Sequence, residues 1–69
     1  MKDRTGQVWM VADGGWVILI VGPPKPAADG APLHPALMLD AGCSKGRTGM
    51  VFDYQDRPPL EESGRVRLL

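Results

Sequence analysis

Five short apolar runs separated by glycine and proline constrain most strongly what this chain of 69 residues can fold into. Each run has the length of a β-strand, and none is long enough for a convincing helix. The glycines and prolines between them are typical of turns. The pattern predicts an all-β fold, a single domain over residues 1–69 that closes as a five-stranded antiparallel barrel. The apolar runs cover residues 8–11, 16–21, 36–39, 50–54 and 66–69.

The turn-forming residues between the apolar runs refine the bounds of the expected strands. We expect strands over 7–12, 16–21, 36–39, 48–54 and 65–69, with Asp13-Gly14-Gly15 closing the first hairpin. Residues 1–6 are polar and predict a loose N-terminus. Residues 22–34 predict a long proline-rich loop, because prolines follow the second strand at once and no apolar period follows them. A proline followed by Glu61, Glu62 and Gly64 predicts one short helical turn before the last strand.

Alternation along the strands gives an expected core. The second strand is apolar on both faces, which predicts a central strand that is covered on each side. Left uncovered, its run of β-branched and aromatic residues would be an aggregation hazard. The expected inward-facing residues are Val8, Met10, Ile18, Ile20, Leu37, Leu39, Phe52, Val66 and Leu68, with Arg65 and Arg67 outward.

Composition limits the chemistry. The chain has one cysteine and one histidine, so it predicts no internal disulfide, no Cys/His zinc cluster and no cofactor. A net charge of zero argues against a nucleic-acid binder that works through a bulk positive field. The polar start and the short apolar runs predict no membrane span and a cytoplasmic or virion-associated protein. A domain this small has marginal stability, so good packing, a homo-oligomer or docking on a lattice must support it.

The proline loop and the two tryptophans are the predicted protein-binding site. The loop is too long for a simple connection, and its prolines reduce the ordering entropy lost on binding. In so small a core we expect one tryptophan inside and one partly exposed as an interface anchor; the alternative places both inside. The predicted protein-binding residues are Trp9, Trp16, Pro23, Pro24, Lys25 and Pro26.

Four arginines in the C-terminal third form a second candidate surface. Guanidinium groups on one side of a barrel would bind phosphates or carboxylates, and mutual ion pairing with the interleaved acids is the alternative. The acids themselves predict a solvated rim, and His34 predicts a surface or edge histidine. Cys43 is expected to be a dispensable turn residue, because only three residues separate it from Arg47 and a phosphatase loop needs five. The possible anion-binding residues are Arg47, Arg57, Arg65 and Arg67.

Two resemblances follow from these residues. Five strands, a long loop after the second and a helical turn before the last resemble the SH3-like barrel, a layout that occurs among phage and actinobacterial accessory proteins. Residues 34–39 and 45–51, together with 6–9, resemble part of the barrel core of the MazF-type toxin endoribonucleases. His34 stands where that family has arginine, the catalytic threonine is missing, and so is the C-terminal half. The resemblance implies the barrel without the activity.

These observations predict a non-enzymatic protein–protein interaction module, a small accessory protein of a phage or bacterium with no catalytic residues. Its protein partner is not defined by the sequence. A virion structural protein of the capsid or tail is the first alternative, and stoichiometry in particles would separate it. A reduced MazF-like endoribonuclease is the second, and an RNA cleavage assay would separate it.

Overall fold

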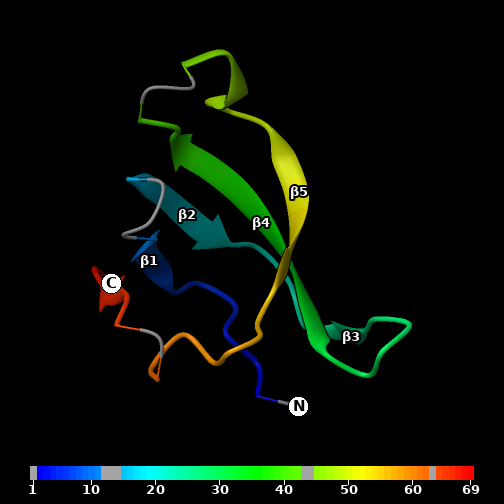
Figure 1. Cartoon of the computed structure of the whole chain (residues 1–69). Coiled ribbons are helices and arrows are strands. Elements are labelled where there is room, and N and C mark those ends of the chain that lie inside the picture. Colours follow the sequence, from blue (N-terminus) through cyan, green and yellow to red (C-terminus); the bar gives the residue numbers. More distant parts are fainter. Residues whose placement is uncertain (1, 12–14, 43–44, 63) are drawn as a thin grey trace.

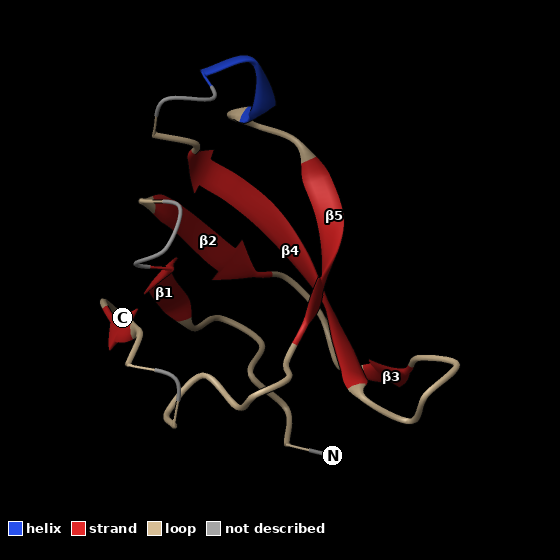
Figure 2. Ribbon diagram, viewed as in Figure 1, coloured by secondary structure: helices blue, strands red, loops and turns tan. Residues whose placement is uncertain are grey.

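A computed structural model describes residues 2–11, 15–42, 45–62 and 64–69 of the chain. It confirms the predicted all-β class: an antiparallel sheet of six strands accounts for nearly all the regular structure (Figure 2). The strands begin and end one to several residues away from the predicted bounds, which is usual for boundaries read from sequence. They are β1 (Val8–Val11), β2 (Trp16–Ile20), β3 (Lys25–Pro26), β4 (Pro32–Asp40), β5 (Val51–Gln55) and β6 (Val66–Arg67).

The topology places β2 and β4 at the centre of the sheet. The strand order is β3-β4-β2-β1-β6, and β5 also pairs with β4 (Figure 1). All pairings are antiparallel, and β1–β2, β3–β4 and β4–β5 are each consecutive in the chain. The last strand returns to pair with the first, where Met10 lies opposite Val66. A radius of gyration of 11.3 Å is that of a compact single domain of this length.

The predicted barrel closure is not made by strand pairing. Among the described residues, the ladder runs from β6 to β3 and β5 without a pairing that joins its ends. The inner face of the sheet is instead covered by the chain that connects β5 to β6, from which Leu60 inserts into the core, fully buried. The described residues form six strands rather than the five expected from sequence, because part of the predicted loop forms one more.

The proline-rich segment is a continuation of the β2–β4 pairing. Lys25 lies opposite Leu33 and Pro26 opposite Pro32, on a strand interrupted after β2. Gly22 marks the interruption, since a Cβ there would come within 2.9 Å of the Pro35 ring. The expected loop over 22–34 therefore contains two paired stretches, at Lys25–Pro26 and from Pro32 onward. A proline has no N–H to donate to a strand ladder. It can still lie in a strand where its carbonyl or its neighbours make the hydrogen bonds.

The helical turn lies in a different connection from the one predicted. A 3-10 helix, η1 (Lys45–Arg47), joins β4 to β5. Before β6 the chain makes a turn in which Glu62 donates its N–H to the Pro59 carbonyl at 3.0 Å, without continuing as a helix. Cys43 lies outside the described residues, as do residues 12–14 of the first hairpin loop.

The core contradicts the expected facing of three strands. In β1, Trp9 and Val11 are buried in place of Val8 and Met10; in β4, Ala36 and Met38 replace Leu37 and Leu39. Val66 and Leu68 are half exposed rather than inward. The expectation is right for Ile18 and Ile20 in β2, and Phe52 in β5 packs against the core.

The pairing register explains these reversals. Residues opposite each other in an antiparallel pair share a face. Ile18 lies opposite both Trp9 and Met38, and Ile20 lies opposite Ala36. Once the two isoleucines face inward, their partners must do so, whatever the hydrophobicity of the residues on either side.

Substitution of adjacent residues in β4 tests this facing. Met38→Ala should lower the free energy of unfolding by about 2–5 kcal/mol, because it leaves a cavity beside Ile18. Leu39→Ala, at a side chain 42% exposed, should lower it by only about 0.5 kcal/mol. Urea denaturation at low protein concentration measures both. A larger effect at Leu39 than at Met38 would mean that β4 faces the other way.

Candidate functional site

Asp56 is the centre of a buried polar cluster that joins the N-terminal segment to the chain after β5. Its Oδ2 accepts a hydrogen bond from Arg4 Nε at 2.7 Å, and its Oδ1 accepts the Leu60 N–H at 2.9 Å. The side chains of Arg4 and Asp56 are 2% and 5% exposed. A buried ion pair is tolerated only where hydrogen bonds satisfy its remaining groups, and this one meets that condition.

Arg4 is held by two carboxylates and one aromatic ring. Besides Asp56, its terminal nitrogens donate to both oxygens of Glu61, and its guanidinium carbon lies 5.5 Å from the centre of the Trp9 ring. An Asp3–Thr5 turn positions Arg4, because the Asp3 carboxylate accepts both the N–H and the hydroxyl of Thr5. The expectation of a loose N-terminus is therefore wrong at Arg4.

The ion pairs shift the pKa values of the groups that form them. Hydrogen bonds from Arg4, and then from Lys2, hold the pKa of the Glu61 carboxyl far below its usual value of 4.5. The hydrogen bond to Glu61, with a smaller contribution from Asp56, raises the pKa of Arg4 although burial opposes it. Both groups therefore stay charged across the neutral range, and the cluster is a fixed set of ion pairs.

His34 lies in the core beside this cluster, not at the surface as predicted. Its side chain is fully buried, and Nε2 is 3.4 Å from Asp56 Oδ2. It faces inward because it pairs with Tyr54 and precedes the inward Ala36 by two residues. The side chain that stands where the MazF-type toxins have arginine is therefore buried.

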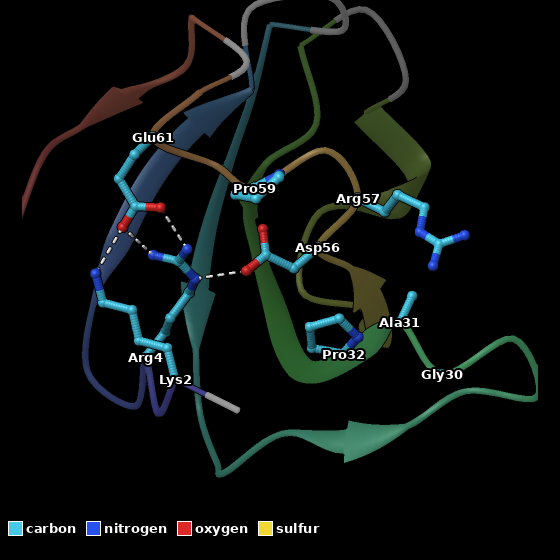
Figure 3. A pocket seen from close by; sticks show the side chains of 9 residues that line it. All are labelled: Lys2, Arg4, Gly30, Ala31, Pro32, Asp56, Arg57, Pro59 and Glu61. Carbon is cyan, nitrogen blue, oxygen red and sulfur yellow. Dashed lines mark hydrogen bonds and ion pairs between the residues drawn. The ribbon is translucent and has the colours of Figure 1, made fainter.

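A shallow cleft of about 460 Å³ opens above the cluster. Figure 3 shows Arg4, Lys2 and Glu61 on one side of Asp56, with Arg57 directed away from them on the other. Four of the five charged groups in the lining already pair with one another, and the fifth, Arg57, pairs with Asp29 at 3.2 Å. Because Arg4, Asp56 and Glu61 satisfy each other, the cleft offers no free buried charge to a ligand. We assign this cluster to stability: it ties the N-terminal segment over the core.

The second feature is the face of the sheet directed away from the core. Val8 lies opposite Leu19, Leu19 opposite Leu37, and Leu37 opposite Val51, so the four form one row across β1, β2, β4 and β5. Val51 is 67% exposed. Antiparallel sheets with one solvated face normally alternate polar residues there, and this face does not. Figure 1 shows these four strands side by side.

More apolar side chains flank the row on the same face. Met10 lies opposite Val17 and Val66, and Leu39 follows Leu37 by two residues along β4. Beyond the apolar region the face ends in a polar border, where Lys25 and Asp53 form an ion pair at 3.2 Å next to Gln55. We name this surface the outer apolar face; it comprises Val8, Met10, Val17, Leu19, Val21, Leu37, Leu39, Val51 and Val66.

The structure separates the predicted protein-binding residues. Trp9 is buried and Trp16 is partly buried against the core, which confirms one tryptophan inside and one partly exposed. Trp16 begins β2, whereas Pro23, Pro24, Lys25 and Pro26 follow its other end. Trp16 and the proline segment therefore lie at opposite ends of β2, and the binding role of these residues stays a prediction.

The four arginines do not gather on one surface either. Arg47 ends η1 with its guanidinium 6.0 Å from the Trp16 ring, and Arg57 follows β5 and pairs with Asp29. Arg65 and Arg67 lie at β6, where Arg67 donates to the Leu69 carbonyl. Sequence reasoning missed the arginine that does enter a built cluster, Arg4, because its partners lie more than fifty residues away.

Comparison with protein-family models, with curated proteins and with solved structures found no match for this chain. Among the described residues, no helix is long and apolar enough to cross a membrane. The same part of the chain holds no group of three histidine, cysteine or acidic residues that could bind a metal ion.

Loss of the buried cation tests the role of the cluster. Arg4→Met should lower the free energy of unfolding by about 3–5 kcal/mol, because it leaves the Asp56 carboxylate buried without its partner. Lys2→Met removes an exposed pair to the same Glu61 and should cost less than about 1 kcal/mol. Denaturant unfolding compares the two. If Arg4→Met unfolds the chain, a partial recovery in Arg4→Met with Asp56→Asn still identifies the buried charge as the cause; equal small effects would contradict the assignment.

Acid unfolding tests Glu61. Because the pKa of Glu61 is lowered in the folded chain, its contribution to stability is complete above about pH 4.5 and is lost as the pH falls. Glu61→Gln should therefore melt lower than wild type at neutral pH and show a shallower decline between about pH 5 and pH 2. Glu62→Gln, at the adjacent exposed glutamate, is the control and should follow the wild type. Parallel curves for wild type and Glu61→Gln would refute the ion-pair role.

Proposed function

We propose that this chain is a non-enzymatic protein–protein interaction module that docks through its outer apolar face onto an apolar, uncharged protein surface. The observation that carries the proposal is the row Val8–Leu19–Leu37–Val51, a continuous apolar strip across four strands. Large exposed apolar patches are uncommon on isolated soluble domains and mark interaction sites.

The inner and outer faces support this proposal together. The inner face already has its cover in the chain segment around Leu60 and in the Arg4 cluster. On the outer face Val21, Leu39, Val51 and Val66 are exposed and the other side chains are half-buried, although β2 carries apolar residues on both sides as a strand covered twice would. A partner that covers this face would remove the aggregation hazard of an exposed apolar sheet.

The two alternatives use different features. A virion structural role would use the same outer apolar face to dock on a lattice, so it differs in partner and copy number. An endoribonuclease would need groups that contact RNA, and His34, in the segment that resembles the toxin barrel, is fully buried. The interaction module is the function that this geometry supports best.

Site-specific photo-crosslinking tests the docking surface. A benzophenone amino acid placed at Val51, which is exposed at the end of the row, should form covalent protein adducts in cells. The same probe at Glu62, exposed on the chain after β5, is the matched control and should form few. Adducts at Glu62 equal to those at Val51, or none at Val51, would place the docking surface elsewhere.

A further inference from the structure

We propose that the partner on the outer apolar face is a second copy of this chain, so that the protein forms a symmetric homodimer by packing two sheets face to face. This inference rests on the proposed docking function and names its occupant. Two features of the described face lead to it: its charge pattern and its area.

The charge pattern makes the face complementary to itself. In a two-fold interface the same patch meets itself, so any unpaired charge in it would meet a like charge. The central row is uncharged. Of the charges around it, Lys25 and Asp53 have opposite signs and already pair, and Asp40, opposite Val17 at the end of β4, accepts the Gly42 N–H. The chain as a whole has zero net charge at pH 7, so two copies do not repel each other over long distances.

The area suits a small dimer. A specific interface buries roughly 500–800 Å² on each partner, which is about an eighth to a fifth of the 4099 Å² surface of this chain. The apolar region spans β6, β1, β2, β4 and β5, a width of about 19 Å at ordinary strand spacing. Two such faces would pack about 10 Å apart, as the sheets of a sandwich do.

The size of the domain gives a reason for dimerisation. A chain this short buries too little apolar surface to be very stable alone, and oligomerisation is one of the few ways to add more. A second copy would complete a two-layer core in which β2 is covered on both sides. Ile18 and Ile20 would lie in the inner layer, and Val17 and Leu19 would lie in the layer between the copies.

Sedimentation equilibrium of the purified chain over a dilution series tests the proposal. Wild type should show a reversible monomer–dimer equilibrium. Val51→Lys should raise the dissociation constant at least about tenfold, because two-fold symmetry brings the buried charge into the interface twice. Ala28→Lys adds the same charge on the exposed turn after β3 and should leave the constant unchanged. Both variants change exposed positions, and circular dichroism checks that both remain folded.

Dilution followed by NMR is the second measurement, and it needs no substitution. Signals of Leu19 and Leu37, on the outer apolar face, should shift on dilution, and signals of the inward Ile18 and Ile20 should shift less. A wild-type chain that stays monomeric at its highest soluble concentration, or a dimer that Val51→Lys leaves intact, overturns the homodimer. Photo-crosslinks from Val51 to a different protein would then leave the docking function standing, whereas the absence of any adduct would remove both.

Discussion

The pairing of β2 between β1 and β4 is the constraint on which the rest of the structure depends. Each residue of β2 fixes the face of one residue on either side, so Ile18 directs Trp9 and Met38 into the core at once. The same coupling sends Leu19 outward together with Val8 and Leu37. The core and the outer apolar face are therefore two consequences of one register, and neither can change facing without the other.

The buried cluster around Asp56 completes the inner layer. Sheet pairing alone leaves one open side, and the chain after β5 closes it by inserting Leu60. Asp56 fixes that segment by accepting the Leu60 N–H, and Arg4 fixes Asp56 in turn. The ion pairs join residues more than fifty positions apart in the sequence, so they hold the N-terminal segment against the chain after β5.

Function follows from the difference between the two faces. The inner face is covered from within the chain, and Arg4, Asp56 and Glu61 satisfy each other there. The outer face carries apolar side chains on five strands, with the Lys25–Asp53 ion pair at one border and Asp40, opposite Val17, at another. A domain that buries Arg4 and Asp56 as a satisfied pair and leaves apolar side chains on its outer face fits the association proposed above.

The sequence by itself determined the all-β class, the approximate positions of five of the six strands and the inward face of β2, because short apolar runs between glycines and prolines carry that information locally. It also showed that β2 is apolar on both sides. Only the tertiary structure decided the facing of β1, β4 and β6. Neighbouring residues in β1 and β4 have similar hydrophobicity, and all three strands take their facing from their partners. The cluster of Arg4, His34, Asp56 and Glu61 could not be predicted from the sequence either. Contacts between distant residues create it, and no local spacing of residues indicates them.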